Sequence, residues 1–255
     1  MTVNAAPLRH HAAAGLRAVL DLCVPPGCPL CGADGVPPPG RLTPRCHCVR
    51  SFADPAAGWC AACGASLGPH VPDAADCHHC RREDRFPFAG CVSLGLHEGD
   101  LRDAVLIAKS PHGRPAARAL GEALLEERAD VLRAWGGDLV VPVPHHWRDA
   151  ASRTFAPPAE LAAALAAGLG VPCRPRALRK TARTAKQASL TPTDRRANLR
   201  AAFAVRRPAA VAGERVLLCD DVLTTGTTAR RCARALLDAG AAAVLVAVFA
   251  RGVGR

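Results

Sequence analysis

The sequence predicts an α/β protein: a parallel sheet with helices on both faces, plus a small cysteine-rich, zinc-binding N-terminal module. Two observations predict this fold class. After residue 86, short apolar runs alternate with segments of helical periodicity, as in parallel sheets covered by helices. Before it, nine of the 13 cysteines fall within residues 23–80. The 255 residues, 49% of them hydrophobic, suit one medium domain and a small accessory one.

We expect three regions: an N-terminal helix in residues 1–24, the zinc-binding module in 25–85 and the sheet domain in 86–255. Helically spaced apolar residues over 8–23, stopped by Pro25 and Pro26, predict the first helix. In the sheet domain we expect strands over 89–96, 138–143, 172–178, 215–219 and 243–249. We expect helices over 99–109, 115–135, 157–169 and 227–239.

Residues 28–85 are rich in Pro, Gly, Cys and His and lack a long apolar periodicity. Because such a segment cannot build a conventional core, we expect a metal ion to stabilise it. Paired cysteines in a reducing compartment indicate metal ligation rather than disulfides. Two CxxC pairs supply the four thiolates of a tetrahedral structural zinc site: Cys60, Cys63, Cys77 and Cys80.

A second zinc site is predicted from four further cysteines: Cys28, Cys31, Cys46 and Cys48. Neighbouring histidines could replace a cysteine ligand, and the spacing leaves open which cysteine pairs share an ion. Reduced thiols without metal are the alternative interpretation. A closed site of four thiolates has no open coordination position, so we expect zinc to have a structural or interaction role rather than a catalytic one.

A polar loop that contains glycine follows the apolar run over 216–219. Asp220 and Asp221 stand at the carboxyl end of this predicted strand, where open α/β sheets bind ligands. The next polar residues lead into a helix, and their backbone N–H groups and hydroxyls, with the helix dipole, would hold one phosphate group. These residues are Thr224, Thr225, Gly226, Thr227 and Thr228. A helix cap is the alternative, although one such residue would suffice for it.

The charge is concentrated between Arg174 and Arg207, where eleven basic residues face one acid, Asp194, a net +10 of the chain's +11. This distribution favours a local anion site over a generally basic protein. We expect Arg183 and Lys186 to belong to a mobile cationic lid over a bound anion. A solvated loop and a groove for a nucleic-acid backbone are the alternatives, and no aromatic residue in 174–202 offers a stacking platform.

The run over 216–228 resembles the signature of type I phosphoribosyltransferases, and the chain from about Cys28 to Arg251 resembles the ComF/GntX family. Besides the paired cysteines and the loop, the resemblance rests on these residues: Val141 to Pro144, His146-Trp147-Arg148, Arg153-Thr154-Phe155, Gln187, Leu190, Arg195, Asn198, Ala202-Phe203 and Ala250-Arg251.

The resemblance implies that Asp220 and Asp221 hold the ribose hydroxyls of phosphoribosyl pyrophosphate (PRPP) and that residues 224–228 hold its 5′-phosphate. It places the turn formed by Pro144, His145 and His146 beside the pyrophosphate, which Mg²⁺ bridges to the ribose. Two departures concern the acceptor pocket. Residues 153–157 read Arg-Thr-Phe-Ala-Pro instead of Arg-Gly-Phe-Asn-Gln, and Lys109 is followed by Ser-Pro-His-Gly.

We therefore expect a phosphoribosyltransferase that uses Mg²⁺ and PRPP with an unidentified acceptor. The alternative is a non-catalytic module that senses PRPP or a nucleotide and binds DNA or a protein partner. The ComF resemblance implies a link to DNA uptake and competence, with single-stranded DNA or DNA-uptake proteins as partners. A cytoplasmic location without membrane insertion is expected, since the longest apolar run, 241–250, is too short to span a bilayer.

Overall fold

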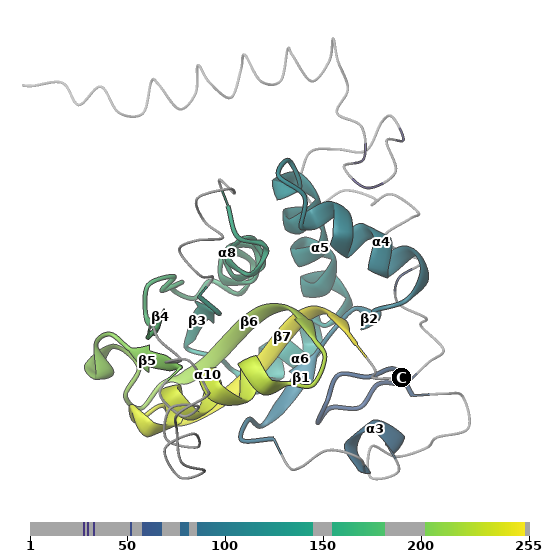
Figure 1. Cartoon of the computed structure of the whole chain (residues 1–255). Helices are drawn as coiled ribbons and strands as arrows, with labels where there is room; N and C mark the ends of the chain where they lie inside the picture. Colours follow the sequence, from purple (N-terminus) through teal and green to yellow (C-terminus); the bar gives the residue numbers. More distant parts are fainter. Residues whose placement is uncertain are drawn as a thin grey trace, which may run out of the picture.

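The computed structural model describes most of the sheet domain and part of the cysteine-rich module (Figure 1). The described residues are 28, 30, 33, 52, 58–67, 77–81, 86–144, 155–181 and 202–252. The predicted N-terminal helix over 8–23 lies outside them. The boundary at residue 85 stays a prediction. Among the described residues, no helix combines the length and apolar character needed to cross a membrane.

A parallel sheet forms the centre of the molecule, in the order β1-β7-β6-β3, with β2 also paired to β7. Its strands are β1 (Gly90–Val92), β2 (Gly95–Leu96), β3 (Leu139–Pro142), β6 (Arg215–Leu223) and β7 (Ala243–Arg251). β1 and β2 share one register, because Gly90 lies opposite Leu245 and Gly95 lies opposite Ala250. The strand expected over 89–96 is therefore confirmed as one edge strand that is interrupted at residues 93–94.

Five helices accompany the sheet within the described residues: α4 (Gly99–Ala108), α5 (Arg114–Glu127), α6 (Ala129–Trp135), α8 (Pro157–Leu169) and α10 (Thr227–Asp238). The bounds of α8 are those expected from the sequence. The single helix expected over 115–135 is wrong, because Arg128 separates α5 from α6 with φ −120° and ψ 19°, outside the helical region. Two short helical turns, α3 (His78–Arg81) and η3 (Pro208–Ala210), complete the set.

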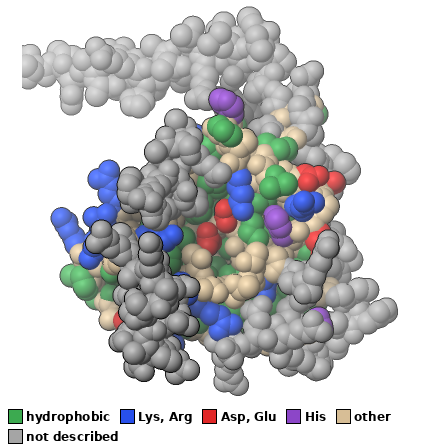
Figure 2. Space-filling view, in the orientation of Figure 1, with side chains coloured by type: hydrophobic (Ala, Val, Ile, Leu, Met, Phe, Trp, Pro, Cys, Tyr) green, Lys and Arg blue, Asp and Glu red, His purple; other side chains and the backbone are tan. Residues whose placement is uncertain are grey.

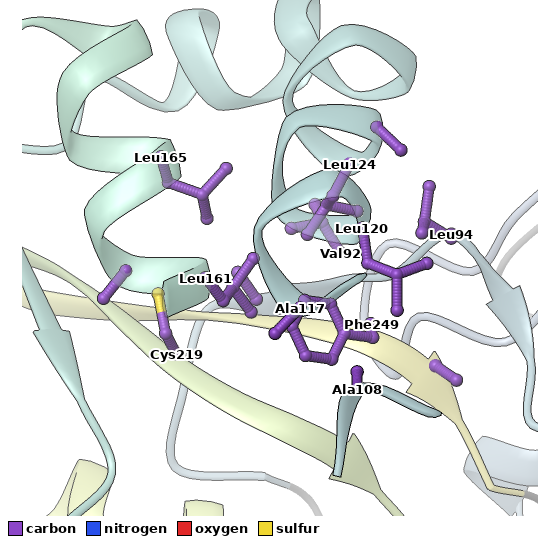
Figure 3. Packing of buried hydrophobic residues seen from close by; sticks show 14 of the residues in the cluster. Val92, Leu94, Ala108, Ala117, Leu120, Leu124, Leu161, Leu165, Cys219 and Phe249 are labelled. Atoms are coloured by element: carbon purple, nitrogen blue, oxygen red, sulfur yellow. The ribbon is translucent and has the colours of Figure 1, made fainter. Parts of the chain in front are cut away.

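Strand residues alternate between the two faces of the sheet. In β6, Leu217 and Cys219 join the core formed with α4, α5 and α8. Val216 and Leu218 join the core on the opposite face, with α10. Figure 3 shows the first core, in which leucines of α5 and α8 lie over Cys219 and Phe249 of the sheet. The predicted three-layer arrangement, with helices on both faces, is confirmed.

The strand expected over 172–178 is wrong in most of its length. Only Cys173 bridges the sheet, pairing in parallel with Val140. Pro172 and Pro175 flank this bridge, and a proline lacks the N–H that a continued ladder requires. The chain then leaves the sheet and forms β4 (Leu178–Lys180), which pairs antiparallel with β5 (Phe203–Val205) in a separate two-stranded sheet.

Candidate functional site

The glycine-containing loop joins the carboxyl end of β6 to the first turn of α10. β6 extends through Asp220 and Asp221 to Leu223, four residues farther than the sequence predicted. The loop threonines are exposed, whereas Gly226 is buried and has φ +68°. A Cβ at Gly226 would lie 2.8 Å from Cε1 of Phe86, so only glycine fits this turn. The exposed hydroxyls and the N-terminus of α10 therefore lie together on a fixed turn, an arrangement that could hold an anion.

A buried arginine at the end of β7 holds the start of this loop in place. Nη1 of Arg251 donates to the carbonyl oxygens of Leu223 (2.8 Å), Thr224 and Gly252 (2.5 Å). Arg251 is only 1% exposed, so these carbonyls are satisfied away from water. The sequence pattern includes Arg251 in the family resemblance but assigns it no role. An arginine that directly ends an apolar strand is the signal that could have revealed one.

Asp220 and Asp221 lie side by side on β6 in different environments. Asp220 is buried, and its Oδ1 accepts from the backbone N–H of Asp221 at 2.9 Å. Burial, and then the neighbouring Asp221 carboxylate, raise the pKa of Asp220 to about 7. The backbone N–H of Asp221 and the ammonium of Lys109 oppose this rise in pKa. A divalent cation would favour the ionised form of both carboxylates, since carboxylate oxygens are the ligands that Mg²⁺ prefers.

Lys109 and His97 adjoin the carboxylates. The sequence pattern connects the segment at Lys109 with the acceptor pocket and assigns no role to His97. Nζ of Lys109, directly after α4, lies 3.1 Å from Oδ2 of Asp221. His97 follows β2, and burial, with the charges of Lys109 and Arg102, lowers its pKa. Its buried Nε2 has no hydrogen-bond partner in the described part of the chain. Acidic, basic and histidine side chains adjoin on the face shown in Figure 2.

The other residues expected at this site divide into two groups. Pro144 comes two residues after β3. The N–H of Val143, between them, donates to the Cys219 carbonyl at 2.8 Å, so Pro144 stands at the same end of the sheet as Asp220. Four expected residues lie outside the described part of the chain: His145, His146, Arg183 and Lys186.

Four cysteines of the module converge, as their spacing predicts. The Sγ atoms of Cys60, Cys63, Cys77 and Cys80 all lie within 4.8 Å of one another. Sγ of Cys60 is 3.6 Å from that of Cys80, and Sγ of Cys63 is 3.7 Å from that of Cys77. These distances exceed a disulfide bond of about 2.05 Å and match the ~3.8 Å between thiolates of a tetrahedral ion with ~2.3 Å bonds. The cluster could therefore hold a metal ion such as zinc.

The protonation state of these thiols would change if a metal ion bound. Burial raises the pKa of Cys63 to about 11 and also raises that of Cys80. Although burial acts in the same direction on Cys60, hydrogen bonds from the backbone at Cys63 and Ala62 lower its pKa. A bound cation would stabilise the thiolate forms, and its binding would release protons from the thiols whose pKa is raised.

One backbone hydrogen bond of this cluster recurs at Cys28. The N–H of Cys60 donates to the carbonyl of Ala65 at 2.8 Å, and the N–H of Cys28 donates to that of Ala33 at 2.8 Å. Both segments read Cys-x-x-Cys-Gly-Ala. The remaining cysteines of the expected second site, Cys31, Cys46 and Cys48, lie outside the described residues.

The cysteine cluster docks on the β1 edge of the sheet. The N–H of Cys91 donates to the carbonyl of Ala61 at 2.9 Å, and Oγ of Ser93 donates to the carbonyl of Gly64 at 2.5 Å. A Cβ at Gly90 would lie 2.4 Å from the Ala61 oxygen, so this close approach requires glycine. The sheet edge is thereby covered, which removes a strand edge open to pairing.

Arg128 joins the same contact from the junction of α5 and α6. Its Nε donates to the carbonyl of Ser93 at 3.0 Å, and its guanidinium lies 5.1 Å from the ring centre of Trp59. One side chain therefore bridges the interrupted edge strand and the module.

The chain is similar to a protein-family model and to named bacterial proteins. The family model described as phosphoribosyl transferase domain matches residues 159–254. A "DNA utilization protein YhgH" from Salmonella typhi is 32% identical over 195 residues, covering 73% of this chain and 81% of that protein. The protein of the same name from Escherichia coli strain K12 is 31% identical over the same length and shares of the two chains.

Two solved structures were also similar. One, described as the allosteric regulatory enzyme of purine biosynthesis, is 26% identical with a TM-score of 0.40, over 53% of this chain and 26% of that one. A glutamine PRPP amidotransferase from B. subtilis, complexed with ADP and GMP, is 26% identical with a TM-score of 0.39, over 54% of this chain and 27% of that one. On the family-model match, the identity to the YhgH proteins and the cysteine cluster, this chain belongs to the ComF/GntX family and carries a type I phosphoribosyltransferase-like domain.

Proposed function

We propose that the sheet domain binds PRPP together with Mg²⁺ at the carboxyl end of β6. The observation that carries this proposal is the arrangement around Gly226: an exposed, threonine-rich turn at the N-terminus of α10, directly after two adjacent carboxylates. In this assignment the loop over 224–228 binds the 5′-phosphate through its N–H groups and hydroxyls. Asp220 and Asp221 bind the ribose hydroxyls.

Asp220 and Asp221 lie where Mg²⁺ would bind together with the substrate, and the ion would neutralise charge that develops on the leaving group. The chain's own residues orient the ligand. Arg251 fixes the loop backbone, and Gly226 keeps the turn open for the phosphate. Lys109, which pairs with Asp221, would compete with Mg²⁺ for this carboxylate.

We propose a role for the protein in handling DNA, in line with ComF-type DNA uptake, because its relatives are named DNA utilization proteins. Two forms of this role follow. In the first, the protein is a phosphoribosyltransferase with an unidentified acceptor. In the second, PRPP or a nucleotide is a sensed ligand, and the protein binds DNA or a protein partner. The departures from the family in residues 153–157 favour testing both forms.

Calorimetry with Mg²⁺ and PRPP tests the ligand proposal. Wild-type protein should bind PRPP only with Mg²⁺, and Asp221→Ala should weaken this binding at least about tenfold, a difference of ~1.4 kcal/mol. Asp103→Ala removes an exposed aspartate of α4 and is the matched control. Failure of wild-type protein to bind PRPP at saturating Mg²⁺ would contradict the proposal. Release of pyrophosphate in the presence of candidate bases then distinguishes turnover from sensing.

The lid proposed for Arg183 and Lys186 has its own test. Neutralising both residues should weaken binding of PRPP and pyrophosphate much more than binding of ribose 5-phosphate, whose phosphate occupies the loop over 224–228. Equal effects on all three ligands, or none, would remove these residues from the pyrophosphate site.

A further inference from the structure

Four arginines of the basic segment line a groove that the proposed PRPP site does not use. The groove has a volume of about 600 Å³. Its described lining consists of Arg174, Pro175, Arg176, Ala177, Arg206, Arg207 and Ala210. All four arginines are exposed, and no acidic residue is present among the described lining residues. Lys and Arg side chains gather on the left side of Figure 2, where Figure 1 shows β4 and β5.

The backbone under these arginines is held by regular hydrogen bonds. The N–H of Arg174 donates to the carbonyl of Val140 in β3 at 2.9 Å, and that of Arg206 donates to the carbonyl of Ala177 at 2.8 Å. Arg207 caps the turn η3, since its carbonyl accepts from the N–H of Ala210 at 2.9 Å. The groove is therefore built on backbone anchored to the sheet rather than on a free loop.

This groove lies far from the phosphate loop. The phosphate loop joins α10 at its first residue, Thr227. At the other end of that helix, Arg234 and Asp238 line a second groove together with β5 and Pro208. The segment after η3 contacts the same end, where the N–H of Gly213 donates to the carbonyl of Gly240 at 2.8 Å. The 12 residues of α10 span ~18 Å at ~1.5 Å per residue. These arginines therefore lie away from the loop that is proposed to bind the 5′-phosphate.

The chemistry of the lining indicates the ligand. A guanidinium group binds phosphate through two parallel hydrogen bonds, and four of them along one groove suit successive phosphates of a chain. The other described lining residues are proline and alanine, so no aromatic side chain among them offers a stacking surface for bases. The volume matches a site for a drug-sized molecule, which corresponds to a short stretch of one sugar-phosphate strand rather than a duplex.

We propose that this groove binds the backbone of single-stranded nucleic acid without sequence preference and independently of PRPP. The choice of nucleic acid as the polyanion rests on the proposed role in DNA handling, whereas the site itself rests on the groove. The proposal assigns different roles to different parts of the basic segment between Arg174 and Arg207. The two ends of the segment form this groove, and Arg183 and Lys186 remain candidates for the lid.

Fluorescence anisotropy with a labelled oligothymidylate of about 20 nucleotides, at several salt concentrations and with full-length protein, tests this proposal. Arg174→Gln/Arg207→Gln should weaken binding roughly tenfold at low salt. The slope of log affinity against log salt should flatten by about 0.7 for each phosphate that the groove no longer neutralises. The matched control is Arg118→Gln/Arg133→Gln, which removes two exposed arginines from α5 and α6 and should leave binding unchanged. PRPP should neither compete with the oligonucleotide nor bind the groove variant less tightly.

Three results would overturn the proposal: no binding of oligothymidylate by wild-type protein at low salt, equal losses of affinity in the groove and control variants, or competition by PRPP. Polyglutamate serves as the second probe. If it binds as tightly as the oligonucleotide and is weakened equally in the groove variant, the groove serves an acidic protein partner instead. Because PRPP affinity is measured separately, failure here is distinguishable from failure of the PRPP proposal.

Discussion

The ammonium group of Lys109 lies 3.1 Å from a carboxylate oxygen of Asp221, so the cation after α4 and an acid of β6 form an ion pair. Both side chains are partly exposed, at 30% and 19%. In the proposed complex, a Mg²⁺ ion beside Asp221 would compete with this ammonium group. The ion pair would then set the Mg²⁺ concentration at which that site fills.

Lys109→Met should lower the Mg²⁺ concentration that half-saturates PRPP binding. A partly exposed ion pair contributes up to about 1 kcal/mol, which corresponds to a change of roughly two- to fivefold. Calorimetric titrations at fixed PRPP and varied Mg²⁺ measure this concentration. Arg118→Met removes a cation that pairs with Glu122 on α5 and is the control. A higher Mg²⁺ requirement would show that Lys109 binds the ligand rather than competing with the metal.

The stability of the metal-free domain should depend on the titration of Asp220. Its pKa in the folded protein, about 7, lies above its ordinary value of 3.8. At pH values between these two, the protein therefore takes up a proton when it folds. Its contribution to stability is therefore fully present below pH 3.8 and is lost as the pH rises through about 7.

Asp220→Asn has a side chain that cannot ionise. In the presence of EDTA, its free energy of unfolding relative to that of wild type should be higher at about pH 8 than at about pH 5. Urea unfolding at the two pH values measures the difference, with Asp103→Asn as the exposed control. A difference that is the same at both pH values would show that Asp220 does not titrate in this range.

Ser93→Ala should weaken the docking of the cysteine cluster on the sheet. The substitution leaves the Gly64 carbonyl without its buried donor, which costs ~1–3 kcal/mol. Urea unfolding should show this loss, and limited proteolysis should cut the module faster than in wild type. Ser110→Ala, in the turn after α4, is the control. Unchanged proteolysis would mean that the contacts of Ala61 and Arg128 suffice for docking.

Purified untagged protein should contain at least one zinc ion per chain, because four converging thiols have the spacing of a tetrahedral site. Cys60→Ser should lose this ion and lower the thermal midpoint, since the cluster covers the β1 edge. Elemental analysis and thermal scans measure the two effects. Cys173→Ser, at the opposite sheet edge, should keep its zinc. Wild-type protein without zinc would contradict the assignment.

Arg251→Met should damage the phosphate loop while approximately conserving side-chain volume. Each carbonyl left without its donor costs roughly 1–3 kcal/mol, and the loop backbone loses its support. Affinity for ribose 5-phosphate should fall together with stability. Arg251→Lys should restore part of the stability but less of the affinity, because the lysine ammonium group ends one atom short of the position of Nη1 and cannot reach all the carbonyls. Wild-type affinity in a folded Arg251→Met variant would exclude the supporting role.

The sequence by itself determined the elements whose pattern is local. The apolar run, the two acids and the threonine-rich turn predicted β6, the loop and α10, since strand burial and helix capping depend on neighbouring residues. The bounds of α8 followed in the same way from Pro157 at its start and Gly170 after its end. The CxxC spacing predicted the cysteine cluster, because a tetrahedral ion restricts its ligands more strongly than any loop does.

Only the tertiary structure decided which distant residues meet. Lys109 reaches Asp221, Arg251 supports Leu223, and four arginines from the two ends of one segment share a groove, although no local periodicity connects them. The break at Arg128 likewise depends on its contacts with Ser93 and Trp59. Such pairs arise from the order of strands in the sheet. That order is set by long-range packing of the two cores, which hydrophobic periodicity along the chain does not specify.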